Sequence, residues 1–146
     1  MSETAPRPAP SSVEDCLCFR ARLVARRMTE FYEARLAPHG VNLPQFGLLG
    51  TIGSERNASI SHLAKRLQLD PSTLSRTLRP LIDAGLVETF ADPDNLRVRR
   101  VRLTADGKQR TREAARAWAQ AQEDAAKTIS PDAMELLVAQ TATLRA

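Results

Sequence analysis

The chain has 146 residues, a formal net charge of +4 and two cysteines, and 42% of its residues are hydrophobic but only 4% aromatic. This length suits one domain of ordinary size with a mainly aliphatic core. No stretch reaches the roughly 18 apolar residues that span a bilayer, and the first residues lack a secretion-signal pattern. Two cysteines do not make a disulfide framework, so we expect a cytoplasmic protein.

The predicted elements are mainly helical. Residues 1–12, rich in Pro, Ser and Ala, predict a disordered arm, and helical spacing of apolar residues predicts helices over 13–36, 44–53, 57–70, 71–85, 105–128 and 131–144. The predicted N-caps are Ser59, Asp70, Thr104 and Ser130. Residues 86–90 and 98–103 alternate apolar with polar side chains around the turn-forming ADPDN, which predicts a β-hairpin with a charged tip. The expected fold is mainly α with a small β-hairpin, a single domain over 13–146 that contains a winged helix-turn-helix over 44–104.

The predicted helix 71–85 has the two faces expected of a DNA-reading helix. Its apolar stripe is Leu74, Leu78, Leu81 and Ile82, and its opposite face carries Ser72, Thr73, Ser75, Arg76, Thr77 and Arg79. Small hydroxyl residues allow close approach to base edges, and arginine can read guanine with two hydrogen bonds. The helix N-terminus is a further candidate site for a phosphate. The alternative is an ordinary solvated face.

The second predicted strand concentrates positive charge, with Arg97, Arg99, Arg100 and Arg102 within six residues. Arg97 lies nearest the hairpin tip, and an arginine there can enter the minor groove of DNA. The alternative is a solubilising edge strand, because natural sheets protect their edges with charge.

The terminal helices carry more apolar surface than a lone winged helix can bury. The long helix carries Ala114, Trp118 and Ala121, and the last helix carries Met134, Leu137 and Val138. We therefore expect residues 13–40 and 105–146 to form dimerisation helices that place two DNA-reading helices one DNA turn apart.

The stretch from "GLLGTI" through "LDPSTLSRTLRPLIDAGLVETFADPDNLRVRRVRLTADGK" resembles the MarR family of bacterial transcriptional regulators. The more specific parts are "L…GLV", the Asp-rich wing tip, and "LT..G" at Leu103, Thr104 and Gly107. The resemblance implies a homodimer on a palindromic double-stranded DNA operator, with helix 71–85 in the major groove and Arg97 in the minor groove. The family often has an Asp two residues before that arginine, whereas Asn95 stands here, so that ion pair is lost.

The family resemblance also implies a small-molecule effector, often a phenolic carboxylate, held between the dimerisation helices and the winged helix. The candidate lining residues are Arg22, Arg26, Phe31, His39 and Phe46. For Phe31 and Phe46 the alternative is a place in the core, and for His39 a place in a loop.

Oxidation is a second candidate signal. Residues 18–45 resemble the organic-hydroperoxide-sensing OhrR branch, in which the position of Cys18 holds the peroxide-reactive thiol and two tyrosines stabilise it. Tyr32 matches one tyrosine, but Arg22 stands in place of the other. Cys18 and Arg22 share a helix face, and a nearby guanidinium favours a thiolate. Tyr32 is about 21 Å along the helix from Cys18 and could reach it only from the partner subunit.

The alternative for both Cys16 and Cys18 is packing as small apolar side chains. On a helix their side chains would diverge by about 200°, which disfavours a disulfide between them. Cys-x-Cys on a helix is poor chelation geometry, so we expect no metal or other cofactor.

The sequence thus predicts a dimeric DNA-binding transcriptional regulator, a repressor relieved by a small aromatic ligand. A regulator that senses peroxide through Cys18 and a winged-helix module that binds protein instead of DNA are the alternatives. No Gly-rich phosphate loop, nucleophile elbow or paired carboxylates suggest an enzyme.

Overall fold

The computed structural model describes residues 12–144, so the predicted arm lies almost entirely outside the described residues. In chain order the helices and strands are α1 (Leu17–Leu36), α2 (Leu43–Ser54), α3 (Ile60–Arg66), α4 (Pro71–Asp83), β1 (Val87–Ala91), β2 (Arg99–Leu103), α5 (Ala105–Ala126) and α6 (Pro131–Thr141). Single 3-10 turns cover Val13–Asp15 and Ala37–His39. The mainly helical fold with one hairpin is confirmed.

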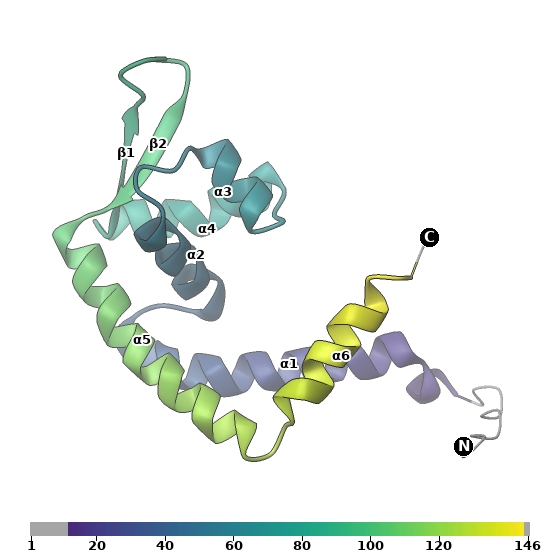
Figure 1. Ribbon diagram of the computed structural model, residues 1–146. Helices are drawn as coiled ribbons and strands as arrows, with labels where there is room; N and C mark the ends of the chain where they lie inside the picture. Colours follow the sequence, from purple (N-terminus) through teal and green to yellow (C-terminus); the bar gives the residue numbers. More distant parts are fainter. Residues whose placement is uncertain (1–11, 145–146) are drawn as a thin grey trace.

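The elements form two parts that α5 connects (Figure 1). Helices α2, α3 and α4 and the hairpin make a compact winged helix-turn-helix, while α1, α6 and the far end of α5 form an elongated base. The two strands are antiparallel and pair Val87 with Leu103 and Ala91 with Arg99. No helix within residues 12–144 is long and apolar enough to cross a membrane.

Side-chain caps set the start of most helices, as the sequence predicts. Ser59, Asp70, Thr104 and Ser130 each accept a hydrogen bond from a backbone N–H of the first turn that follows. Such caps satisfy amides that have no partner inside a helix. Helix α4 ends as expected, with Gly85 in the left-handed region at φ +71°.

Some predicted boundaries are wrong by a few residues. The first α-helix begins at Leu17, not at residue 13, because Val13–Asp15 form a separate 3-10 turn and Cys16 is the N-cap. Asn42 caps α2 in a capping box with Gln45, so Pro44 is the second helical residue and not the first. Helix α4 ends at Asp83, two residues before Gly85, and Pro80 lies inside it.

The core lies within the winged helix-turn-helix and is aliphatic. Leu49, Leu63, Leu74 and Val101 have no exposed surface, and one residue comes from each of α2, α3, α4 and β2. Of the predicted apolar stripe of α4, Leu74, Leu78 and Leu81 are buried and Ile82 packs against the core at its edge. This burial fixes which face of α4 remains exposed.

The start of α5 is docked on the corner between α4 and β1. The Thr104 hydroxyl donates to the Gly85 carbonyl at 2.7 Å and accepts from the Gly107 amide at 3.0 Å, while the Thr104 amide donates to the Leu86 carbonyl at 3.1 Å. Further along, Arg110 donates to the His39 carbonyl at 2.8 Å. These bonds join the first two turns of α5 to the corner between α4 and β1 and to the turn after α1.

Candidate nucleic-acid interface

The exposed face of α4 is polar along its whole length. Ser72, Ser75, Arg76 and Arg79 are exposed, and Thr73 and Thr77 are half-buried beside them. All six residues predicted to contact DNA from this helix therefore lie on or beside its solvent face. The hydroxyl of Thr77 donates to the Thr73 carbonyl at 3.0 Å.

The N-terminus of α4, a candidate phosphate site, is capped by a carboxylate. The Asp70 carboxylate accepts from the amides of Ser72 (3.0 Å) and Thr73 (2.9 Å) and from both of their hydroxyls (2.5 and 2.6 Å). These hydroxyl and amide donors hold the pKa of Asp70 far below its ordinary value. A negative charge already occupies the helix terminus, so the serine and threonine present only their acceptor lone pairs to solvent.

The two arginines of α4 differ in whether a carboxylate pairs with the guanidinium. Arg79 pairs with Asp83 one turn later at 3.1 Å, and both side chains are well exposed. Arg76 makes only a long hydrogen bond of 3.3 Å to the Thr73 hydroxyl. Arg76 therefore carries the uncompensated positive charge of this face.

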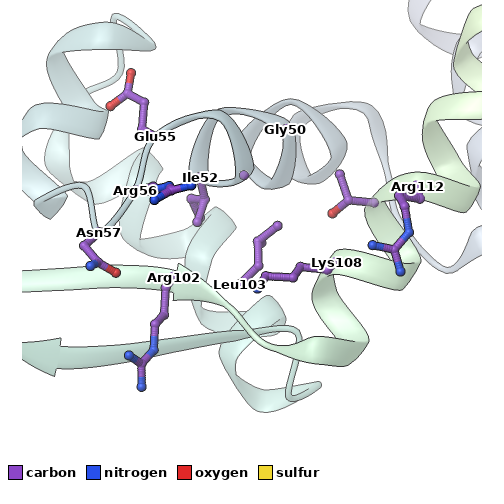
Figure 2. A pocket seen from close by; sticks show the side chains of 11 residues that line it. Gly50, Ile52, Glu55, Arg56, Asn57, Arg102, Leu103, Lys108 and Arg112 are labelled. Carbon is purple, nitrogen blue, oxygen red and sulfur yellow. The ribbon is translucent and has the colours of Figure 1, made fainter.

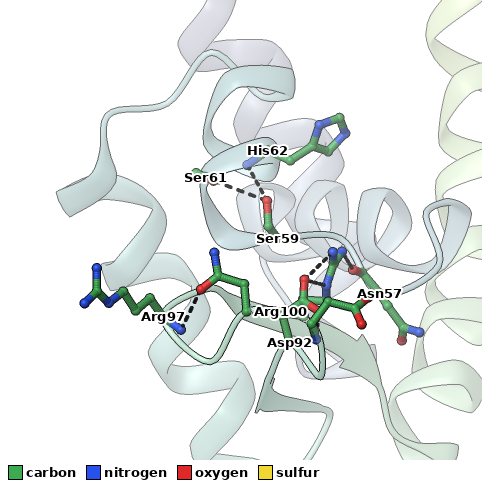
Figure 3. Close-up of polar contacts among 9 residues, drawn as sticks. Asn57, Ser59, Ser61, His62, Asp92, Arg97 and Arg100 are labelled. Atoms are coloured by element: carbon green, nitrogen blue, oxygen red, sulfur yellow. Dashed lines mark hydrogen bonds and ion pairs between the residues drawn. The ribbon is translucent and has the colours of Figure 1, made fainter.

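The wing presents Arg97 without a partner for its guanidinium among residues 12–144 (Figure 3). Asn95 accepts a hydrogen bond from the backbone amide of Arg97 at 3.2 Å and does not touch its side chain. The asparagine thus shapes the turn and leaves the arginine free. Arg99 donates to the Thr89 hydroxyl of the facing strand at 2.8 Å and keeps its full charge.

A buried carboxylate braces the base of the wing, a feature that the sequence reasoning missed. Asp92 is only 6% exposed and accepts from Arg100 Nε at 2.7 Å and from the Asp94 amide at 3.0 Å. The Asp94 amide, and after it the Arg100 guanidinium, hold the pKa of Asp92 below its ordinary value. Arg100 also donates to the Asn57 carbonyl at 2.8 Å, which ties the wing to the loop before α3 (Figure 3). The signal was available in the hairpin register, because Phe90 faces Arg100 and Asp92 lies two residues beyond Phe90 on the same face.

The five candidate effector residues do not form one site within a protomer. Arg22 and Arg26 are exposed on α1, and Phe31 lines a cavity of about 210 Å³ between α1 and α5. The Arg35 guanidinium lies 3.6 Å from the centre of the Phe31 ring. His39 is half-buried in the turn after α1, and Phe46 packs on Trp118 with ring centres 5.9 Å apart.

The candidate redox residues are also apart within the protomer. Cys18 is exposed on α1 with Arg22 one turn further on, while Tyr32 is buried and donates its hydroxyl hydrogen bond to Gln122 of α5. Both cysteines are free thiols. Cys16 lies before the helix with an extended ψ of 125°, so the divergence of about 200° expected for two helical positions does not apply to this pair.

No group of three or more His, Cys, Asp or Glu side chains that could hold a metal ion occurs in the part of the chain that the structure describes.

The sequence model of the MarR family matches residues 41–99, which run from the start of α2 to the start of β2. A curated relative, the HTH-type transcriptional regulator TtmR of Methylorubrum extorquens, is 32% identical over 108 residues, which are 74% of this chain and 55% of the relative. The chain belongs to the MarR family. The organic hydroperoxide resistance transcriptional regulator of Bacillus subtilis is 26% identical over 65% of each chain. The chain thus spans between about half and two thirds of the curated relatives that it matches.

The MarR-family fold extends beyond the matched segment. The crystal structure of the M. tuberculosis transcriptional regulator MosR in complex with DNA is 28% identical, has a TM-score of 0.73, and covers 89% of this chain and 100% of the MosR chain. The likeness therefore includes the long terminal helices as well as the winged helix-turn-helix.

Proposed function

We propose that this MarR-family chain is a homodimeric, sequence-specific DNA-binding transcriptional regulator. The observation that carries the proposal is the pair of uncompensated arginines, Arg76 on the exposed face of α4 and Arg97 on the wing, on a fold that MosR shares when bound to DNA. A recognition helix and a wing are the two elements with which a winged helix contacts adjacent grooves.

In this proposal α4 lies in the major groove. Ser72, Ser75 and Arg76 face the base edges, where an arginine can make two hydrogen bonds to guanine and small hydroxyl residues allow close approach. Arg79 and Arg99, whose side chains are held by neighbours, contact phosphates and set the register. Arg97 enters the minor groove beside this site, and the Asp92–Arg100–Asn57 brace holds the wing in position.

Dimerisation is supported by apolar surface that one protomer leaves exposed. On α1, Leu17 and Phe19 are 77% and 56% exposed, and on α6, Leu137 and Val138 are 54% and 67% exposed. Several large apolar side chains left exposed on the same helices favour a protein interface there. A two-fold dimer through these helices would bind a palindromic operator, with one half-site for each α4.

The test is fluorescence anisotropy with DNA from upstream of the chain's own gene, across a salt series. We expect a specific complex whose affinity falls steeply with salt. Arg76→Ala should reduce the preference for the specific site, whereas Arg97→Ala should weaken binding by about tenfold with dimerisation intact. Arg116→Ala, an exposed substitution on α5, is the charge-matched control and should have little effect. Failure to bind any palindromic site would favour the alternative, a module that binds protein.

We further propose that the regulator is a repressor relieved by a small aromatic acid, which rests on the family resemblance. The test is release of the bound DNA by salicylate and by its uncharged analogue salicylamide. Release by neither compound contradicts an aromatic acid as the effector.

A thiol-responsive regulator is the second candidate, favoured by the exposed position of Cys18 and by the likeness to the hydroperoxide regulator of B. subtilis. A hydroperoxide would oxidise the Cys18 thiolate to a sulfenic acid while it is itself reduced to the alcohol. The test is loss of DNA binding on addition of cumene hydroperoxide. Cys18→Ser should abolish the response and Cys16→Ser should preserve it, and a response that survives Cys18→Ser excludes this candidate.

A further inference from the structure

A cavity of about 590 Å³ lies between α2, β2 and the first turns of α5 (Figure 2). Its volume falls within the range of small-molecule sites. Ile52 and Leu103 contribute apolar side chains, while Arg56, Lys108 and Arg112 bring three cationic side chains to its edge. None of the five effector residues predicted from the sequence lines this cavity.

The three cations have no charged partner among residues 12–144. No ion pair or hydrogen bond is formed by the side chains of Arg56, Lys108 or Arg112 within that range. Arg102, the fourth basic residue of the lining, is different, because it pairs with Glu88 at 2.6 Å and lies over the Phe90 ring. In Figure 2 the Arg102 side chain points away from the other three.

The acidic residue of the lining does not neutralise the cavity. Glu55 is engaged by His62 and by Arg66, each at 2.6 Å, and its side chain points away from the cavity in Figure 2. The remaining polar residue from α5, Thr111, donates its hydroxyl hydrogen to the Gly107 carbonyl at 2.7 Å and so offers only acceptor lone pairs. Three like charges around one concave, partly apolar space concentrate a positive potential that an anion would relieve.

We propose that this cavity binds a small organic anion with two or three carboxylate or phosphate groups on a short apolar body. The anionic groups pair with Arg56, Lys108 and Arg112, and the apolar body contacts Ile52 and Leu103. Arginine is well suited to this because its guanidinium makes paired hydrogen bonds to carboxylate and phosphate. Lys108 lies in the second turn of α5, where the helix N-terminus adds to the favourable field.

The position of the cavity couples such a ligand to DNA binding, and this second step rests on the proposed function. Arg56 belongs to the segment that leads into α3, Leu103 ends the wing strand, and Lys108 and Arg112 belong to α5. An anion bridging these elements fixes the angle between α5 and the winged helix-turn-helix. By linkage, DNA then changes the affinity for the anion by the same factor as the anion changes the affinity for DNA.

The experiment is isothermal titration calorimetry of the full chain without DNA, at constant ionic strength. The probe is benzene-1,3,5-tricarboxylate, and the comparison is benzoate, which has the same ring and one carboxylate. We expect one tricarboxylate per protomer and at least tenfold weaker binding of benzoate. Arg56→Gln, Lys108→Gln and Arg112→Gln should each weaken tricarboxylate binding by about tenfold, the effect of losing one charge-assisted hydrogen bond.

Arg116→Gln is the matched control, because it removes the same charge from α5 one turn beyond Arg112 and outside the cavity. Equal weakening by all four substitutions, or no binding of the tricarboxylate, overturns the site. The same four variants are then titrated with operator DNA in the absence of anion. If the three cavity variants lose DNA affinity with a shallower salt dependence and Arg116→Gln does not, these cations contact phosphate and the site is overturned. A chain that binds the tricarboxylate but no DNA keeps the site and loses the proposed function.

Discussion

Gly107→Ala tests how tightly α5 is docked on the winged helix-turn-helix. Gly107 is buried in the first turn of α5, and a Cβ added there would lie 1.9 Å from the Leu86 carbonyl oxygen and 2.9 Å from its carbon. Real Cβ atoms stay at least 3.0 Å from such a neighbour, so the helix would have to retreat by about 1.1 Å. Both contacts are with backbone, which cannot rotate away as a side chain can.

The cost follows from three contributions. A retreat of this size breaks the 3.1 Å bond from the Thr104 amide to the Leu86 carbonyl, at about 1 kcal/mol. Overpacking costs a further 1–3 kcal/mol or so, and the higher helix propensity of Ala returns about 1 kcal/mol. The free energy of unfolding should therefore fall by about 1–3 kcal/mol, which lowers the Tm by roughly 3–10 °C for a chain of this size.

The assay is thermal unfolding followed by circular dichroism at a fixed protein concentration. Gly47→Ala is the control, because a Cβ on this exposed glycine of α2 meets nothing within 4 Å. That control should be neutral or stabilising by up to about 1 kcal/mol. If Gly107→Ala melts at the wild-type temperature or above, the close approach of α5 to Leu86 is not a constraint on the fold.

Three further predictions concern the cap of α4, the wing and the dimer. Asp70→Ala should lower the Tm at pH 7 by about 2–5 °C. Folding lowers the pKa of Asp70. The stability that the ionised carboxylate contributes is therefore complete above its unfolded-state pKa of about 3.9, and it is lost as the pH falls toward and through the folded-state pKa. The Tm difference between wild type and Asp70→Ala should thus be smaller at pH 3 than at pH 7. An equal Tm difference at both pH values contradicts the role of the ionised Asp70 as the cap. Asp92→Asn should weaken operator binding by about five- to tenfold at unchanged dimerisation, measured by anisotropy and light scattering, whereas an unchanged Kd would show that the brace does not position the wing. Leu137→Asp should shift the chain toward monomer in light scattering while Gln140→Asp on the same helix does not, and a dimer that survives both places the interface elsewhere.

The sequence predicted the fold of the winged helix-turn-helix well because its signals are local. A cap such as Asp70 followed by Pro71 fixes a helix start within a few residues, and alternation around a turn-rich segment fixes a hairpin. Gly107, the glycine of "LT..G", can be recognised from a short sequence motif, but the reason for a glycine there is a contact in the tertiary structure. It allows α5 to pass within contact of the Leu86 backbone, which only the folded chain reveals.

The sequence predicted less where a side chain had a choice of partners. The positive charge on β2 was predicted, but not that Arg100 pairs with Asp92 and reaches the Asn57 carbonyl 43 residues away. Likewise, the N-terminus of α4 was named as a candidate phosphate site, but its capping residue, Asp70, is itself an anion. In the cysteine segment, helical spacing was applied to Cys16, which is the cap of α1 and not part of the helix.

The connection at Thr104 gives a physical reason why a signal in the base could alter DNA binding. Two hydrogen bonds from Thr104 and the close contact at Gly107 fix the start of α5 to the residues that join α4 to β1. Rotation of α5 therefore carries the end of the recognition helix and the start of the wing with it, because a close-packed backbone contact cannot absorb the motion. The cavity bordered by Arg56, Lys108 and Arg112 lies beside this joint, so an anion there would act on its angle directly. A ligand at the base would have to act through the length of α5.

A ligand at the base and an anion in the cavity should respond differently when the contact between Thr104 and the α4–β1 corner is weakened. Thr104→Val removes the hydroxyl bonds to Gly85 and Gly107. It should reduce the effect of a base ligand on DNA affinity more than the effect of the cavity anion, because the anion itself bridges α5 and the winged helix-turn-helix.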